Sequence, residues 1–246
     1  MYSNALITGA SSGLGRGLAL HFAAQGTKVY AAARRKEQLE SLKEESKGAI
    51  VPLVLDVSNA DATHAAVEKL DEECGGLDLV VANAGIGAAT YGKRIDWKVV
   101  EQIIDVNVKG AVATLVGAMP GMVRRGKGHL VGTSSLAAFV GVKRMSAYCA
   151  SKAFLAMFLD SIRLDLEPLG VSVTCLHPGY VKTELTANNK GNMPFLMDLE
   201  PAVAKMANAI ERRLPTYAFP WQLATALKTI ATLPHGLSQA AAKKFA

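Results

Sequence analysis

Short, nearly continuous apolar runs recur along the chain and alternate with helix-like patterns. Six runs rich in β-branched and other apolar residues lie at 5–8, 28–33, 50–55, 77–82, 129–134 and 171–176. Helical periodicity is clearest between them, at 14–25, 35–46, 60–74, 96–119 and 148–167. Runs of this kind are typical of parallel strands that are covered on both faces. We therefore predict an α/β fold with right-handed crossovers and a doubly wound parallel sheet.

The chain length favours one domain over two, because 246 residues suit a single large α/β unit. We expect residues 1–246 to form a single-domain Rossmann-type fold with helices on both faces of the sheet. The segment at about 186–202 has polar ends around an apolar centre at 193–197, which is typical of a lid over an apolar substrate. A packed surface loop is the alternative interpretation of this segment.

The last part of the chain, about 220–246, contains an amphipathic pattern after Pro220. Leu223, Leu227, Ile230 and Ala231 recur there at helical spacing. Such a helix packs on its own protein or on a second subunit, rests on a membrane surface, or borders a long-chain substrate pocket. The sequence leaves these alternatives open.

Charge and cysteine content exclude several classes of function. The net charge is +6, but the basic residues are scattered and lack interleaved aromatic residues, which argues against nucleic-acid binding. Cys74, Cys149 and Cys175 are too far apart for a disulfide framework or a metal site, and we predict no metal. The chain start lacks a signal-peptide pattern, and no segment has about 18 uninterrupted apolar residues. We expect a cytoplasmic protein without an integral membrane segment.

A glycine-rich loop follows the first predicted strand and opens the first predicted helix. It reads TGASSGLG at residues 8–15. Glycines let the backbone approach a pyrophosphate, and the helix N-terminus binds its charge. A plain strand-to-helix turn is the alternative, but this context favours dinucleotide binding. The predicted cofactor contacts in this loop are Gly9, Ser11, Ser12, Gly13, Leu14 and Gly15.

The end of the second predicted strand indicates which dinucleotide is bound. An acidic residue normally holds the adenosine ribose there, but this chain has Ala33, Arg34 and Arg35. No carboxylate repels a phosphate, and the guanidinium of Arg34 is suited to pair with one. The pattern therefore predicts NADP(H), with a solvated turn as the alternative interpretation of the two arginines.

Polar and glycine residues also follow the third and fourth predicted strands. Beyond the carboxyl ends of parallel strands, such residues can reach a ligand. A helix cap and a simple turn are the other interpretations. The candidate cofactor contacts at these ends are Asp56, Val57, Asn83, Ala84 and Gly85.

These motifs occur together with a serine and with Tyr148 and Lys152, four residues apart in SAYCASK. In this order they resemble the classical short-chain dehydrogenase/reductase family over residues 4–185. The resemblance implies that Tyr148 and Lys152 are catalytic and also contact the cofactor. It places the catalytic serine on Ser135 rather than Ser134 and the helix asparagine on Asn107. It adds four cofactor contacts after the sixth strand, namely Pro178, Gly179, Val181 and Thr183.

The chemistry of ketone reduction is compatible with these residues. A free phenol has a pKa of about 10, so it needs help to exchange protons near neutrality. We expect the Lys152 cation to lower the pKa of Tyr148 by about one to three pH units. The resemblance implies that Ser135 orients the substrate oxygen and that Asn107 holds a water. No His or Asp partner for a hydrolytic serine is apparent, and we expect His177 to be structural or to line the cofactor site.

The sequence thus predicts an NADPH-dependent oxidoreductase that interconverts a carbonyl and a secondary alcohol on a moderately apolar small molecule. The alternatives are a 3-oxoacyl-thioester reductase, a non-catalytic NADP(H)-sensing protein, and a membrane-surface protein that uses the C-terminal helix. The helix after Tyr148 is apolar over most of its circumference, which predicts a homodimer or homotetramer. Its apolar residues are Phe154, Leu155, Met157, Phe158, Leu159, Ile162 and Leu164.

Overall fold

The structure is a computed structural model that describes residues 2–187, 189 and 191–242, so parts of the predicted lid and of the C-terminal extension lie outside the described residues. Within them, one sheet of seven parallel strands has the order β3-β2-β1-β4-β5-β6-β7. Its strands are β1 (Asn4–Thr8), β2 (Lys28–Ala33), β3 (Ile50–Val54), β4 (Leu79–Ala82), β5 (Gly128–Thr133), β6 (Val171–Pro178) and β7 (Thr216–Phe219).

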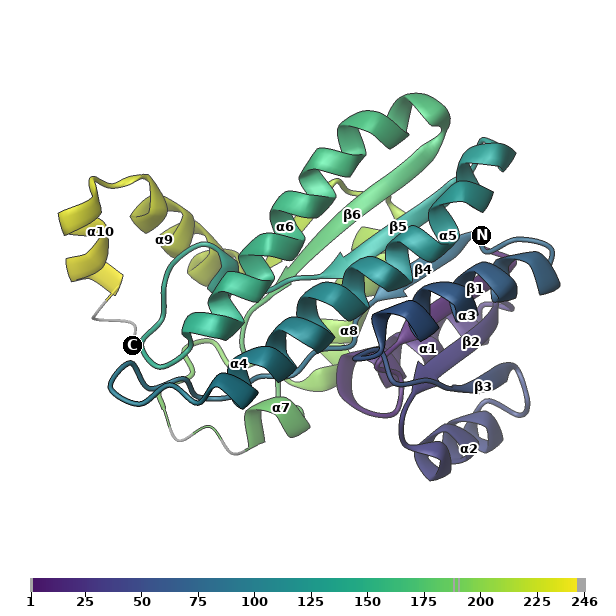
Figure 1. Ribbon diagram of the computed structural model, residues 1–246, viewed down its shortest axis with the longest axis horizontal. Coiled ribbons are helices and arrows are strands. Elements are labelled where there is room, and N and C mark those ends of the chain that lie inside the picture. Colours follow the sequence, from purple (N-terminus) through teal and green to yellow (C-terminus); the bar gives the residue numbers. More distant parts are fainter. Residues whose placement is uncertain (1, 188, 190, 243–246) are drawn as a thin grey trace.

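Helices cover both faces of this sheet (Figure 1). Three of them contribute to the core on one face: α1 (Gly13–Ala24), α2 (Lys36–Glu45) and α8 (Leu199–Glu211). Three others contribute to the core on the opposite face: α3 (Ala60–Glu73), α5 (Ala111–Arg125) and α6 (Ser146–Leu166). The predicted doubly wound α/β fold is therefore confirmed.

Alternation along the strands explains why both faces are apolar. Neighbouring residues Leu6 and Ile7 are both fully buried, but they belong to the cores on opposite faces of the sheet. Successive side chains of a strand point to opposite faces, so a strand buried on both sides must be apolar throughout. In the centre of the sheet Ile7 pairs with Val81 of β4. The strand order reverses between β1 and β4, and in such sheets ligands bind outside the carboxyl ends at that point.

Several boundaries differ from the sequence predictions. β4 begins at Leu79 rather than at 77, and β6 continues to Pro178. β7 was not predicted, because a four-residue edge strand with one buried residue gives only a weak apolar signal. The short C-terminal helix α10 (His235–Ala242) was also not predicted.

The predicted helix at 96–119 is a longer, composite element. It consists of α4 (Trp97–Ile104), a π-helical turn η1 (Asp105–Gly110) and α5, which continues through Pro120. Of the helices in the described residues, this element is the one with the length and hydropathy to cross a membrane. However, 61% of its most apolar stretch is buried inside the protein, so its apolar composition reflects packing in the core.

The C-terminal amphipathic helix is α9 (Trp221–Thr232), and its apolar side packs on its own chain. Leu223, Leu227 and Ile230 are buried in a cluster with Leu136. The assignment of Ala231 to this side was wrong: Ala231 is exposed, and Ala224 takes its place one helical turn before Leu227. The interpretation of α9 as a membrane-surface helix loses its main support, because its apolar side is already covered.

Candidate active site

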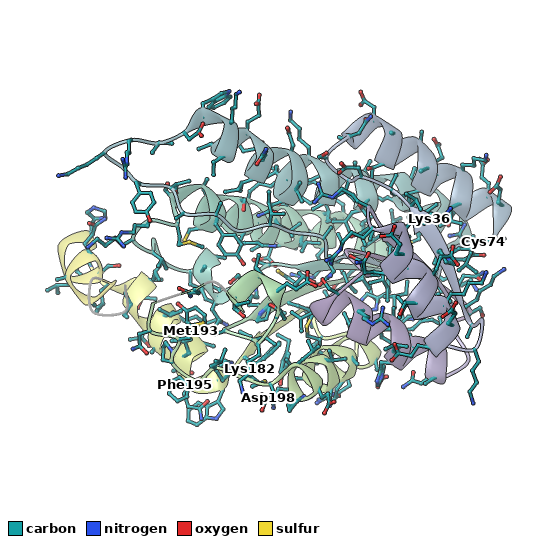
Figure 2. The ribbon with its side chains drawn as sticks, turned by 90° about the horizontal axis from the view of Figure 1, so that it is seen from below. Lys36, Cys74, Lys182, Met193, Phe195 and Asp198 are labelled. Atoms are coloured by element: carbon teal, nitrogen blue, oxygen red, sulfur yellow. The ribbon has the colours of Figure 1, made fainter. Side chains whose placement is uncertain are left out.

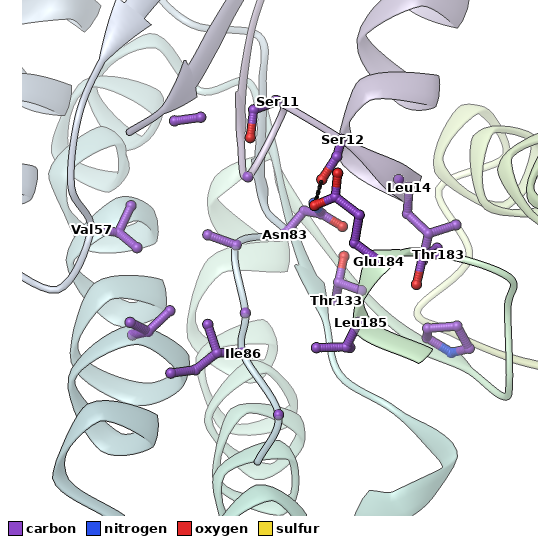
Figure 3. A pocket seen from close by; sticks show the side chains of 18 of the residues that line it. Ser11, Ser12, Leu14, Val57, Asn83, Ile86, Thr133, Thr183, Glu184 and Leu185 are labelled. Carbon is purple, nitrogen blue, oxygen red and sulfur yellow. Dashed lines mark hydrogen bonds between the residues drawn. The ribbon is translucent and has the colours of Figure 1, made fainter. Parts of the chain in front are cut away.

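A cleft of about 600 Å³ opens beyond the carboxyl ends of the central strands (Figure 3). Ser135 lines it, as do nearly all the predicted cofactor contacts: Gly9, Ser11, Ser12, Gly13, Leu14, Arg34, Arg35, Asp56, Val57, Asn83, Ala84, Gly85, Tyr148, Lys152, Pro178, Gly179, Val181 and Thr183. Two predicted residues, Gly15 and Asn107, are not among the lining residues. This volume is within the range of small-molecule and cofactor sites.

The glycine loop has no room for larger residues. Gly9 has a φ of +67°, and a Cβ there would lie 2.7 Å from the Ala84 Cα. A Cβ on Gly15 would collide with the Gly9 carbonyl oxygen and would lie 2.5 Å from Asn83 Nδ2. Gly15 therefore lets the first turn of α1 pack behind the loop, while Gly9 turns the loop toward the cleft. Asn83 ties this arrangement to β1 by donating from Nδ2 to the Thr8 carbonyl at 3.1 Å.

The observed polar groups fit a phosphate-bearing dinucleotide. Ser12 is the N-cap of α1, but its side chain does not cap the helix. The first N–H groups of α1 therefore remain available for an anion. The buried hydroxyl of Thr133, another residue that lines the cleft, has no hydrogen-bond partner among the described residues. A buried hydroxyl without a partner is costly, which makes Thr133 suited to a ligand contact.

The two arginines after β2 behave differently. Arg34 is 66% exposed, and its nearest carboxylate is that of Asp56, at 3.9 Å. Arg35 instead donates to Ser11 Oγ at 2.9 Å and to Ser12 Oγ at 2.7 Å. It also pairs with Glu184 at 3.0 Å. The sequence favoured Arg34 as the phosphate partner, but the structure places the guanidinium of Arg35 directly on the glycine loop.

Glu184 belongs to α7 (Glu184–Ala187), the short helix that borders the cleft after β6. Its carboxylate accepts a hydrogen bond from Ser12 Oγ at 3.1 Å (Figure 3). Glu184 was not predicted from the sequence, although it directly follows Thr183. Its contact with Arg35 spans 149 residues of sequence, and no local pattern indicates such a pair.

Asp56 and Asn59, which follow β3, accept different backbone hydrogen bonds. Asp56 Oδ1 accepts from the Ser58 backbone N–H at 3.0 Å, which forms a local turn. The α3 helix is capped by Asn59, whose side chain accepts from Ala62 N. The alternative interpretation of Asp56 as the helix cap is therefore wrong, and its carboxylate borders the cleft beside Val57.

Asn107 lies behind the cleft in the π-helical turn η1. Its side chain is fully buried and clamps Ile86 by accepting from its N–H at 2.8 Å and donating to its carbonyl at 2.9 Å. Asn107 Nδ2 also donates to Ser151 Oγ at 3.0 Å, and Ser151 Oγ donates to the Tyr148 carbonyl at 2.8 Å. π-Helical turns are frequent at functional sites. This one brings Asn107 into a hydrogen-bonded chain that ends at the backbone of Tyr148.

Lys152 is buried on α6, one turn after Tyr148. Its Nζ donates to the Thr133 carbonyl at 2.8 Å and lies 5.8 Å from the centroid of the Tyr148 ring. Burial lowers the pKa of Lys152 to about 8, because a low-dielectric environment disfavours the charged amine. Burial thus brings the pKa of Lys152 much closer to neutrality than that of an exposed lysine.

The pKa of Tyr148 differs from our prediction in the direction of its shift. Burial raises the pKa of Tyr148, and a hydrogen bond with the Ser135 side chain acts in the lowering direction without reversing the shift. The predicted lowering by Lys152 is not among the effects on this pKa. The Lys152 amine donates to the Thr133 carbonyl. In this state of the protein the phenol stays protonated at neutral pH.

Ser134 and Ser135 make different side-chain contacts. Ser134 Oγ donates to the Lys152 carbonyl at 2.8 Å and so supports α6. Ser135 Oγ accepts from Ala137 N at 3.1 Å and faces Tyr148, whose pKa it influences. Of the two hydroxyls, that of Ser135 is the one suited to meet a substrate oxygen.

The segment predicted as a lid, about 186–202, includes the start of helix α8. α8 begins at Leu199, and Ala202 is already buried in the core. Met197 forms a bridge with Val181 and accepts from Lys182 N at 2.9 Å, which fixes the end of the segment beside β6. Phe195, labelled with Met193 in Figure 2, is 53% exposed. Residues 188 and 190 of the predicted lid lie outside the described residues.

Comparisons with known proteins agree with this geometry. The family profile described as short chain dehydrogenase matches residues 3–193. An uncharacterized oxidoreductase of Myxococcus xanthus is 53% identical over 247 residues, which covers 99% of this chain and 98% of the relative.

Two solved structures are also similar to this chain. A short-chain dehydrogenase from Sphingobium yanoikuyae in complex with NADPH has a TM-score of 0.81 and 26% identity, covering 94% of this chain and 96% of that one. A short-chain type dehydrogenase/reductase from Mycobacterium marinum has a TM-score of 0.79 and 27% identity, with coverage of 88% and 92%. The chain therefore belongs to the short-chain dehydrogenase/reductase family and is an oxidoreductase that acts on CH–OH and C=O groups.

Proposed function

We propose that the chain is an NADPH-dependent carbonyl reductase that interconverts a carbonyl and a secondary alcohol, with Tyr148 as the general acid and base. One observation carries the proposal: the same cleft is lined by two sets of residues. One set is Ser135, Tyr148 and Lys152, and the other is the glycine loop together with Arg35. Proton-transfer groups and an anion-binding loop in the same cleft are what hydride exchange with a dinucleotide requires.

The groups that would hold the cofactor follow from the fit described above. The glycine loop and the N-terminus of α1 would hold the pyrophosphate, and Thr183 and Lys152 would meet the nicotinamide end. When bound, the cofactor supplies the hydride for the carbonyl carbon or accepts it in the reverse direction.

The side chains supply the proton and the orientation. In reduction, the Tyr148 phenol gives its proton to the carbonyl oxygen, while the Ser135 hydroxyl donates a hydrogen bond to the same oxygen. In the proposed cofactor complex the Lys152 cation, whose Nζ lies 5.8 Å from the centroid of the Tyr148 ring, would stabilise the tyrosinate that is left. Asn107 and Ser151 hold the backbone of Tyr148 from behind. The family resemblance adds that Asn107 would hold the water that returns the proton.

The choice of NADPH over NADH is supported by the end of β2. No carboxylate stands at Ala33, and two guanidinium groups follow it. A planar guanidinium can bind a phosphate through two parallel hydrogen bonds, whereas an acidic residue would repel it. The Sphingobium relative, which holds NADPH, supports the same choice.

The substrate is proposed to be moderately apolar. Beyond Tyr148 the cleft is lined by Ile86, Gly87 and Leu185, and a Cβ on Gly87 would lie 3.6 Å from the Tyr148 ring. The segment between α7 and α8, with exposed Phe195 and Leu196, would close over this end. Apolar walls with few polar groups are typical of sites that bind by exclusion of water.

Consumption of NADPH and NADH at matched concentrations tests the proposal against ketones, aldehydes and 3-oxoacyl thioesters. We expect turnover of at least one ketone with NADPH preferred. Arg35→Ala and Arg34→Ala should weaken NADPH binding more than NADH binding, whereas Lys36→Ala removes the same charge one residue further on, outside the cleft lining, and should change neither. Binding of NADPH without turnover of any carbonyl would contradict the proposal and favour a sensor.

We also propose that the protein is a homodimer or homotetramer assembled through α6. Leu155 and Leu159 face the core, but Met157 is 67% exposed and Leu164 is 77% exposed on the same helix. Exposed apolar side chains along one helix mark an interaction surface. A second copy of the chain would cover them.

A reducing compartment such as the cytoplasm is the proposed location. Cys74, Cys149 and Cys175 are free thiols in the described structure. Free cysteines are typical of proteins kept in reducing surroundings.

A further inference from the structure

His177 lies next to the candidate active site, but the proposed mechanism does not use its side chain. It is buried near the end of β6, two residues before Gly179, which lines the cleft. The His177 side chain faces the turn that carries Ser135. Its contacts indicate a role in holding that turn.

The imidazole bonds to the backbone of Ser135. His177 Nδ1 lies 3.2 Å from the Ser135 carbonyl oxygen, and a carbonyl oxygen can only accept, so Nδ1 carries the hydrogen. The same oxygen accepts from Ala138 N at 3.0 Å. The Ser135 carbonyl is thereby held from its own turn and from β6, which restrains the backbone that carries the Ser135 side chain. The Ser135 Oγ itself accepts from Ala137 N at 3.1 Å and donates to the Pro178 carbonyl at 3.4 Å.

The ring of His177 also holds the far end of this turn. Ser135 is the N-cap of the short helix η2 (Leu136–Ala138), and Phe139 follows it directly. The His177 and Phe139 rings are stacked, with centroids 4.7 Å apart and planes inclined by 27°. One side chain therefore contacts both ends of a five-residue segment that begins with Ser135.

Helix α9 supports the stack from the C-terminal part of the chain. Lys228 Nζ lies over the Phe139 ring, 5.2 Å from its centroid. Leu227 and Ile230 of α9 pack in one cluster with Leu136. The C-terminal helix is thus connected to Ser135 through Phe139 and His177.

The charge state of His177 suits a fixed hydrogen-bond donor. Burial and the nearby Lys228 cation lower the pKa of His177, while the hydrogen bond to Ser135 and the Asp160 carboxylate act in the opposite direction. The imidazole is therefore neutral at physiological pH and keeps one N–H, which the Ser135 carbonyl uses.

We propose that His177 is a positioning residue for Ser135, and that Phe139 and Lys228 hold the imidazole in place. The inference rests on the proposed function, because it assumes that the Ser135 hydroxyl meets the substrate oxygen. Loss of the hydrogen bond would let the Ser135 turn relax and would weaken the contact made at the reacting oxygen.

Two substitutions of His177 separate its hydrogen bond from its ring. His177→Phe keeps a stacked ring and removes the N–H, whereas His177→Asn keeps a donor near the Nδ1 position and removes the ring. Each is made in the parent and in a Ser135→Ala background, and kcat, KM for the carbonyl and Kd for NADPH are measured. We expect His177→Phe to lower kcat by about three- to tenfold, the range of one hydrogen bond, with the Kd for NADPH unchanged.

The Ser135→Ala background shows whether His177 acts through Ser135. We expect His177→Phe to have no further effect on kcat there, and His177→Asn to stay closer to the parent than His177→Phe. Lys228→Met should lower kcat about twofold, again only when Ser135 is present, and it probes the same chain of contacts from an exposed position. Lys205→Met, at an exposed position on α8, is its matched control and should leave kcat unchanged.

The outcomes distinguish this inference from the proposed function. An equal loss in both backgrounds, or an unchanged kcat for His177→Phe and Lys228→Met, would overturn the positioning role while Ser135→Ala still loses activity. A parent protein without carbonyl turnover, or a Ser135→Ala variant as active as the parent, would overturn the proposed function and the inference with it.

Discussion

The guanidinium of Arg35 lies 3.0 Å from the carboxylate of Glu184 and joins the glycine loop to the helix that borders the cleft after β6. Glu184 also accepts a hydrogen bond from Ser12 Oγ (Figure 3). The Glu184 carboxylate therefore accepts hydrogen bonds from Arg35 and Ser12, two donors that a phosphate group of the cofactor would use. In the proposed cofactor complex, Glu184 and the phosphate compete for the same guanidinium.

Glu184→Gln should tighten NADPH binding. Removal of the competing charge frees Arg35 and Ser12, and an exposed pair of this kind contributes at most about 1 kcal/mol, so we expect about a two- to fivefold lower Kd. NADH, which lacks the 2′-phosphate, should gain less. Fluorescence titration of both cofactors measures this, with Glu200→Gln on α8 as an exposed control. Unchanged or weaker NADPH binding would show that Glu184 does not compete with the phosphate.

Met157→Glu should dissociate the proposed oligomer. A charge in the centre of an apolar subunit contact would be buried without a partner, which is strongly unfavourable. Light scattering at micromolar concentration should give a dimer or tetramer for the parent and a monomer for the variant. Leu237→Glu, at an exposed apolar position on α10, is the control and should leave the assembly intact. A monomeric parent would contradict assembly through α6.

His129 should make the fold sensitive to acid. It is fully buried, with Nδ1 2.7 Å from the Tyr2 hydroxyl oxygen and Nε2 2.8 Å from Thr174 Oγ1. Burial lowers the pKa of His129 to about 3. Between pH 6.5 and 3 the unfolded chain binds a proton at His129 that the folded chain does not bind. The free energy of unfolding therefore falls as the pH falls through this window, by at most about 1.4 kcal/mol per pH unit.

Urea unfolding at several pH values tests this expectation. His129→Gln removes the titrating group and should give a flatter dependence between pH 6.5 and 4, even though the variant is less stable at neutral pH. His235→Gln replaces an exposed histidine on α10 and should follow the parent curve. The same slope for His129→Gln and the parent would show that other groups cause the acid sensitivity.

The parts of the site that were predictable depend on local patterns. The glycine loop follows a strand and opens a helix, and Tyr148 and Lys152 share a helix face at i and i+4. Strand ends in a parallel sheet meet at one edge, so the residues after each run could be assigned to one cleft. Ser135 and Thr183 were assigned by the family resemblance rather than by these regularities, and both line the cleft.

The parts that were missed depend on contacts between distant segments. The pairing of Arg35 with Glu184 and the bond from Lys152 to the Thr133 carbonyl exist only after the chain has folded. The effect of burial on the pKa of Tyr148 likewise follows from the whole site, and it outweighs the lowering effect of the Ser135 hydrogen bond. The start of α8 inside the predicted lid was missed because its first turn contains Glu200 and Pro201, which match the polar end expected of the lid.

Tyr148→Phe tests the central claim most directly, because it removes one hydroxyl and keeps the ring. The measurement is the rate of NADPH oxidation with the best ketone of the panel, together with the Kd for NADPH of both proteins. A lost general acid predicts a kcat lower by about 10²- to 10⁴-fold, with NADPH affinity within about twofold of the parent. A kcat within about tenfold of the parent would contradict the assignment of Tyr148 as the proton donor.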